Sequence, residues 1–147
     1  MTDDYLRDLW HLGIHEAGHA VVAEYHGHDA VISFTHDGKG GFDHGSTYHF
    51  GKVTETASRE ISLAGAIANH IAYGDDLDAI VWMMLGATVR GGDLGFMSES
   101  DAVGAGKFTV ADVLAVHYIL NDKWDDVLAR AIVATGFHMD MNGRLRA

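Results

Sequence analysis

The sequence predicts a mainly helical α+β fold with a small antiparallel β-sheet or hairpin after the first helix. Two observations indicate this class. Apolar residues recur at helical spacing in four stretches, residues 4–26, 55–73, 77–89 and 110–135. Between the first two stretches the pattern changes to short runs typical of strands. A chain of 147 residues can bury its own core, so we expect one domain over residues 1–147.

The first helix and the strands after it have clear boundaries. Gly27 follows the last apolar positions of the helix and is expected to end it. The runs at 31–35 and 46–50 are rich in β-branched and aromatic residues, so each is expected to be a strand. The glycine-rich segment 37–41 lies between them and is typical of a turn. The two strands are therefore expected to pair as a hairpin.

The later helices are predicted from their end signals. Ser58 is a candidate N-cap of the second helix. Ser100 and Asp101 are typical of a helix start after a glycine-punctuated loop. The last long helical stretch is expected to break at residues 121–122 and to end at Gly136.

Composition narrows the choice of partners. The formal net charge of −11 disfavours binding to nucleic acid or to an anionic membrane surface. No run of about 18 or more apolar residues is present, so we expect a soluble cytoplasmic protein without membrane insertion. The chain has no cysteine, so any zinc ion would be held by histidine, aspartate or glutamate.

The most informative motif is His15-Glu16-Ala17-Gly18-His19 in the first helix. Residues four apart share one helical face, so both imidazoles can bind one zinc ion. The carboxylate of Glu16 would then act as general base on water activated by the metal. The small residues Ala17 and Gly18 would let another helix or the metal approach closely. The motif therefore predicts a zinc peptidase site.

Other histidines near the motif are expected to have other roles. His11 continues the stripe of His15 and His19, but three ligands over two helical turns span too much rise to bind one ion comfortably. We expect His11 to be a surface residue or to lie behind a ligand. His26 and His28 follow the helix and are expected to be solvated.

Two segments resemble the peptidase domain of the FtsH family of ATP-dependent zinc proteases. They are H-E-A-G-H-A at 15–20 and L-A-G-A-I-A-N-H-I-A-Y-G at 63–74. The resemblance implies a zincin-like fold in which His15 and His19 bind zinc, Glu16 is the general base, and an aspartate from a later segment completes the zinc site. The family's arginine and paired glutamates in the second helix are replaced here, by Ala66, Asn69 and His70.

Two aspartates compete for the third ligand position. Asp101, in a Ser-Asp-Ala sequence at a helix start, resembles the acidic motif of the family. Asp93, in a Gly-Asp-Leu sequence, is the alternative. We favour Asp101 because the first turn of a helix holds a side chain more rigidly than a glycine loop does.

The predicted function is zinc-dependent endopeptidic hydrolysis of peptides or unstructured protein chains. The sequence contains no ATPase module of the FtsH type, so folded proteins are not the expected substrate unless a partner unfolds them. A non-catalytic zinc-binding adaptor of a larger protease assembly and a hydrolase of non-peptide amides remain alternatives. Assembly into a homo-oligomer is left open.

Overall fold

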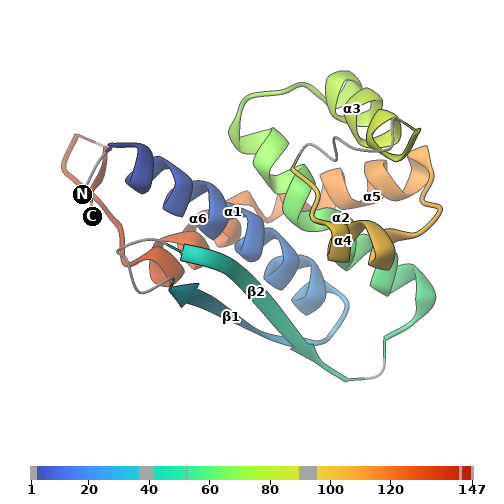
Figure 1. The fold of residues 1–147 in the computed structure, drawn as a ribbon, viewed down its shortest axis with the longest axis horizontal. Helices are drawn as coiled ribbons and strands as arrows, with labels where there is room; N and C mark the ends of the chain where they lie inside the picture. Colours follow the sequence, from blue (N-terminus) through green and yellow to red (C-terminus); the bar gives the residue numbers. More distant parts are fainter. Residues whose placement is uncertain (1–2, 37–41, 52, 90–95, 143, 147) are drawn as a thin grey trace.

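The computed structural model of the chain describes residues 3–36, 42–51, 53–89, 96–142 and 144–146 (Figure 1). Within these residues the fold is mainly helical, with a small antiparallel sheet after the first helix, so the predicted α+β class is confirmed. The elements in chain order are α1 (Asp3–Tyr25), β1 (Asp29–His36), β2 (Phe42–Phe50), α2 (Glu55–Ala72), α3 (Leu77–Val89), α4 (Glu99–Ala105), α5 (Val110–Asp122), α6 (Trp124–Thr135), β3 (His138–Met139) and β4 (Leu145–Arg146).

Helix α1 lies at the centre of the fold, where α2, α6 and the β1–β2 hairpin all pack on it (Figure 1). Its contact with α2 is close: a Cβ atom on Gly18 would lie 2.7 Å from both the Ala64 carbonyl oxygen and the Ala68 Cβ atom. The expected role of Gly18 in close helix packing is therefore confirmed. This contact aligns the middle of α1 with the middle of α2.

The hairpin pairs β1 with β2 in antiparallel register, from Asp29 opposite Phe50 to Thr35 opposite His44. Both strands contact α1, and β2 approaches it near the His-Glu motif: a Cβ atom on Gly45 would lie 3.0 Å from Glu16 Cγ. The predicted strands are confirmed, whereas the predicted turn at 37–41 lies outside the described residues. Strand β2 thus forms a wall beside the motif.

The helix ends follow local hydrogen-bonding rules, with one correction. The N-cap of α2 is Thr54, whose side-chain oxygen accepts a hydrogen bond from the Ala57 backbone N–H. The prediction of Ser58 was wrong because α2 begins one turn earlier and places Ser58 inside the helix. The break between α5 and α6 falls at Lys123, and Gly136 ends α6 in the left-handed region at a φ of 73°.

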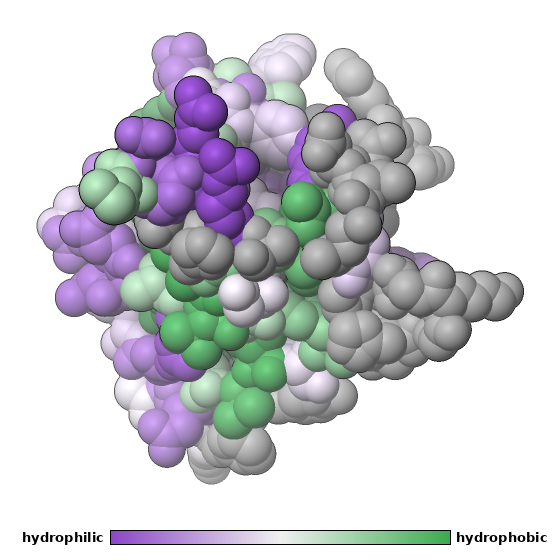
Figure 2. All heavy atoms as spheres, turned by 90° about the vertical axis from the view of Figure 1, so that its left-hand side faces the viewer, coloured by the Kyte–Doolittle hydropathy of each residue, from purple (hydrophilic) through white to green (hydrophobic). Residues whose placement is uncertain are grey.

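The outer surface includes apolar areas. Figure 2 views the left-hand side of Figure 1 and shows apolar residues at the centre of that face, with hydrophilic residues above and to the left. Over half of a typical protein surface is apolar, so this area alone indicates no partner. Among the described residues, no single helix combines the length and the apolar composition needed to cross a bilayer.

Candidate metal centre

Helix α1 brings the His15 and His19 side chains together on its face toward α2. Both are buried, and their Nε2 atoms lie 3.1 Å apart. The helix is held in place around them because Ile14, Ala17 and Val22 are buried in the core. The imidazoles are therefore presented by a rigid element rather than by a loop.

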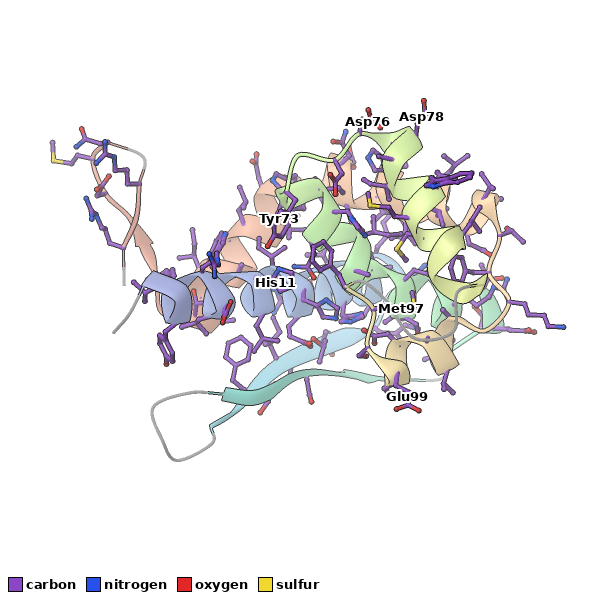
Figure 3. The ribbon with its side chains drawn as sticks, turned by 45° about the horizontal axis from the view of Figure 1, so that its top comes forward. His11, Tyr73, Asp76, Asp78, Met97 and Glu99 are labelled. Carbon is purple, nitrogen blue, oxygen red and sulfur yellow. The ribbon has the colours of Figure 1, made fainter. Side chains whose placement is uncertain are left out.

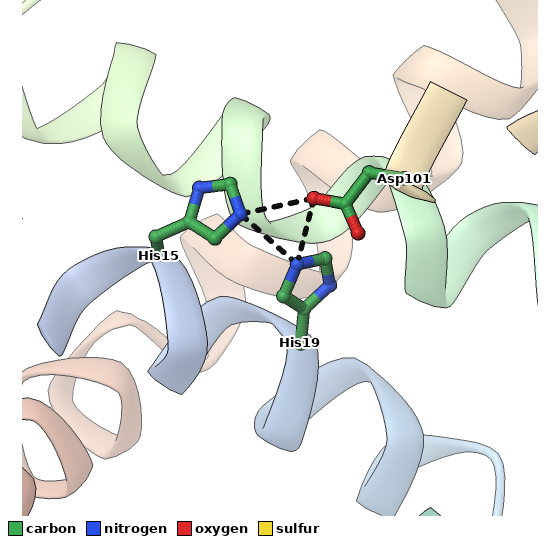
Figure 4. A group of neighbouring side chains, drawn as sticks. All are labelled: His15, His19 and Asp101. Carbon is green, nitrogen blue, oxygen red and sulfur yellow. Dashed lines mark hydrogen bonds and ion pairs between the residues drawn. The ribbon is translucent and has the colours of Figure 1, made fainter. Parts of the chain in front are cut away.

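Helix α4 supplies the acidic partner from far along the chain. The Ser98 hydroxyl caps this helix by accepting a hydrogen bond from the Asp101 backbone N–H at 3.1 Å. Asp101 thus sits in the first turn, as predicted, and its Oδ2 atom lies 3.0 Å from His15 Nε2 and 3.2 Å from His19 Nε2 (Figure 4). Asp93, the competing candidate, lies outside the described residues. The structure brings His15, His19 and Asp101 into one cluster.

Two hydrogen bonds behind the rings fix their tautomers. His19 Nδ1 lies 2.6 Å from the Ile61 carbonyl oxygen, which can only accept, so this nitrogen carries the proton. His15 Nδ1 lies 2.7 Å from Asn69 Oδ1. The amide orientation of Asn69 is fixed because its Nδ2 atom donates to the His11 carbonyl oxygen at 2.9 Å. In the neutral rings, both Nε2 atoms therefore present lone pairs to the cluster.

The donor set fits a divalent cation. Three acceptor atoms, two imidazole nitrogens and one carboxylate oxygen, converge at 3.0 to 3.2 Å from one another and need a positive charge between them. Tetrahedral zinc with bonds of about 2.0–2.1 Å separates its ligand atoms by about 3.3 Å. The triangle in the structure is close to this spacing. Histidine ligands of metals characteristically donate their second ring N–H to a carbonyl or carboxylate oxygen, as Nδ1 does here in both rings.

In the metal-free protein a proton supplies the positive charge. Burial lowers the pKa of His19, but the hydrogen bond to Asp101 and the charges of Asp101 and Glu16 outweigh burial, so the pKa is raised. Burial raises the pKa of Asp101, but the adjacent imidazoles of His15 and His19 hold it well below its ordinary value. His19 and Asp101 therefore form an ion pair when no metal is bound.

This ion pair gives the metal-free protein a specific pH dependence. A raised histidine pKa stabilises the fold fully below the unfolded value of about 6.5, and this stabilisation is lost as the pH rises through the folded pKa. Asp101 stays charged throughout, because its depressed pKa matters only in acid. We expect the urea midpoint in chelator to fall as the pH rises above about 6.5, and to fall less in Asp101→Asn. Parallel declines in the two proteins would contradict the ion pair.

Gly65 on α2 was not recognised from the sequence as a site residue. A Cβ atom there would lie 2.5 Å from both His15 Nε2 and His19 Nε2, so the bare helix backbone forms the floor beneath the two rings. Ile61, Gly65 and Asn69 follow one another at intervals of four, so one stripe of α2 faces the imidazoles. This spacing was the available sequence signal, but it has meaning only once α2 is known to pack on α1.

Replacing Gly65 with alanine is expected to lower zinc affinity at least about 10-fold, because the new methyl group must displace ligand rings from their positions. Gly86→Ala in α3 is the matched control, since a Cβ atom there meets nothing within 4 Å. That control should leave zinc binding unchanged and stabilise its helix by about 0.5–1 kcal/mol. Competition with a fluorescent zinc chelator measures both affinities. Equal affinities for the two variants would refute the role of Gly65.

Glu16 lies beside the cluster rather than in it. Its side chain is buried, and the Thr47 hydroxyl of β2 lies 2.5 Å from Glu16 Oε2 and 3.0 Å from the Glu16 carbonyl oxygen. The hydroxyl has a single proton, and the shorter contact favours donation to the carboxylate. The negative charge of Glu16 also contributes to the raised pKa of His19, so the carboxylate is electrostatically coupled to the cluster. Thr47 was not recognised from the sequence.

These side chains line a single cleft of about 860 Å³. The cluster and Glu16 form one part of its wall, and residues 45–47 of β2 form another. His11 lines the cleft as well, so it is not a plain surface residue; burial and then the charge of His15 lower its pKa, which keeps its ring neutral. His26 is half-buried next to Glu60, with 3.5 Å between His26 Nε2 and Glu60 Oε2, so it is not the fully solvated residue that was expected.

The chain matches no protein-family model, and no curated protein matches it. An assignment of function therefore depends on the geometry and chemistry of this cleft.

Proposed function

We propose that the protein is a zinc-dependent endopeptidase acting on peptides or unstructured protein chains. One observation supports this most strongly: two imidazole lone pairs and a carboxylate oxygen converge in an open cleft next to a second, buried carboxylate. Three protein ligands leave a fourth position for water or substrate, which is the composition of catalytic rather than structural zinc sites. His15, His19 and Asp101 would hold the ion.

The chemistry divides between the metal and the chain. Zinc, when bound, supplies a Lewis acid that lowers the pKa of water and polarises a carbonyl oxygen. Glu16 takes one proton from the attacking water while the oxygen of that water bonds to the peptide carbonyl carbon. The carboxylic acid of Glu16 then returns that proton to the leaving nitrogen as the C–N bond breaks. The Thr47 hydroxyl holds Oε2 of Glu16, which orients the carboxylate for both transfers.

Strand β2 supports an extended peptide as substrate. Its residues 45–47 line the cleft, and in the described part of the chain β2 pairs with β1 alone, so its other edge has no strand partner there. A peptide added along that edge would form main-chain hydrogen bonds without regard to its sequence. This favours hydrolysis of peptides over hydrolysis of small amides.

A relation to the FtsH peptidase domain is part of the proposal. It is supported by the motif at 15–20, by the packing of the 63–74 segment against the two histidines, and by an aspartate in the first turn of a later helix. The rival function is that of a zinc-binding adaptor without activity. A cytoplasmic location remains a prediction, and assembly into a homo-oligomer remains open.

The proposal is tested by incubating the zinc-loaded protein with unfolded, fluorescently labelled casein. We expect fragments that disappear with a chelator and return when zinc is added back. A protein that binds zinc at equal stoichiometry but releases no fragments from casein or from short peptides would favour the adaptor. Hydrolysis restricted to small amides would favour the amide hydrolase.

A further inference from the structure

His11 occupies a distinctive position one helical turn before His15. Its half-buried ring lines the cleft and contacts two aromatic side chains, with ring centroids 4.8 Å from Phe96 and 5.9 Å from Tyr73, both at edge-on angles. Figure 3 shows His11 on α1 beside the end of α2, where Tyr73 lies. These contacts hold the ring in one orientation. The proposed chemistry makes no use of it.

The tautomer of His11 follows from Asn69. The Asn69 amide must place its Nδ2 atom toward His11, because that atom donates to the His11 carbonyl oxygen at 2.9 Å. The same Nδ2 atom lies 3.3 Å from His11 Nδ1. A ring nitrogen that faces an N–H donor must accept, so Nδ1 is unprotonated and the ring proton is on Nε2. This is the opposite tautomer to that of His15 and His19.

The Nε2–H group of His11 is a hydrogen-bond donor that the described residues leave unpaired. Within the part of the chain that the structure describes, no carbonyl, carboxylate or hydroxyl oxygen accepts a hydrogen bond from it. His11 Nε2 is not among the buried side-chain atoms that lack a hydrogen-bond partner. The atom is therefore accessible, and it belongs to a residue that lines the cleft. The other two imidazoles of the cleft have their Nδ1–H groups engaged and their Nε2 atoms in the cluster.

We propose that His11 is a substrate-binding residue whose Nε2–H donates a hydrogen bond to a main-chain carbonyl oxygen of the peptide in the cleft. This rests on the proposed peptidase function and specifies how its substrate is held. A carbonyl is the acceptor that every extended peptide repeats, and a neutral N–H group binds it without requiring a charged side chain. Asn69 thereby serves both histidines: its Oδ1 accepts from His15, and its Nδ2 orients His11.

The tautomers can be observed directly, without activity. Long-range proton–nitrogen correlation spectra of the metal-free protein should show His11 protonated at Nε2. Adding a short, uncharged, unstructured peptide should shift the His11 Nε2 resonances. A His11 ring protonated at Nδ1, or one whose Nε2 resonances do not shift when the peptide binds, would overturn the assignment.

Binding without turnover is measured in the zinc-loaded Glu16→Gln protein, by anisotropy of the same peptide carrying fluorescein. His11→Phe keeps an aromatic ring against Phe96 but has no N–H donor, so we expect peptide affinity to drop about 3- to 10-fold. His11→Gln restores an N–H donor and should bind within about 2-fold of the parent, because one neutral hydrogen bond is retained. Zinc content and unfolding midpoint should match in all three proteins.

The outcomes separate this inference from the proposed function. Weaker binding in His11→Gln than in His11→Phe would show that ring packing matters and would overturn the hydrogen bond. Equal binding in all three, or no binding by the parent, would overturn it as well. Peptide binding with the expected His11 dependence in a wild-type protein that cleaves nothing would instead remove the peptidase function and leave the His11 contact standing.

Discussion

Replacement of Glu16 by glutamine is expected to lower casein cleavage by at least about 100-fold, the lower range of what a positioned general base contributes. Glutamine preserves the size of the side chain and its oxygen near Thr47, but it cannot take a proton from water. Because Glu16 lies outside the triangle of His15, His19 and Asp101, zinc should remain bound at the wild-type stoichiometry. Cleavage rate and zinc content are measured on the same preparation.

A matched carboxylate controls for the loss of one negative charge. Glu55 is exposed at the start of α2 and makes an ion pair only with Arg59 among the described residues. Glu55→Gln should keep full activity. Wild-type turnover by Glu16→Gln would refute the role of Glu16, and loss of zinc from that variant would show that its carboxylate contributes to the metal site itself.

The second large effect is expected at Asp101. Asp101→Asn removes the one carboxylate of the cluster, so zinc binding should weaken by more than about 100-fold. About 100-fold is the upper range for losing a residue that only orients a metal ligand. Activity should fall with zinc occupancy and recover partly in excess zinc. Zinc titration against a competing chelator gives the affinity.

Glu99 provides the control for Asp101, since it is an exposed acid in the first turn of the same helix. Glu99→Gln should bind zinc as tightly as the wild type. Tight zinc binding by Asp101→Asn together with loss of zinc from Asp93→Asn would instead select the competing aspartate.

The first helix and its site residues were predictable because the information is local. A spacing of four places His15 and His19 on one face, whatever the rest of the chain does. The expectation that Asp101 lies in the first turn of a helix also depended on near neighbours, and Ser98 provides the cap. The cap of α2 was not predictable in this way, because Thr54, Thr56 and Ser58 all lie near its start and local sequence does not rank them; the structure begins the helix at Glu55, which makes Thr54 the cap.

The residues that surround the cluster were not predictable, because their roles arise from tertiary packing. Gly65 is an ordinary small residue until α2 packs on α1 and brings its backbone beneath the imidazoles. Asn69 was noted only as a departure from the FtsH pattern, yet its amide fixes the tautomers of two histidines. Thr47 reaches Glu16 across 31 positions of sequence, a distance that no local pattern encodes.

Anomalous diffraction at the zinc edge, from crystals of protein purified without added zinc, tests the central claim most directly. We expect one strong peak within about 2.0–2.2 Å of His15 Nε2, His19 Nε2 and an Asp101 carboxylate oxygen. The absence of a peak there from crystals grown with zinc, or a peak bound by other side chains while these three remain hydrogen-bonded to one another, would contradict the account.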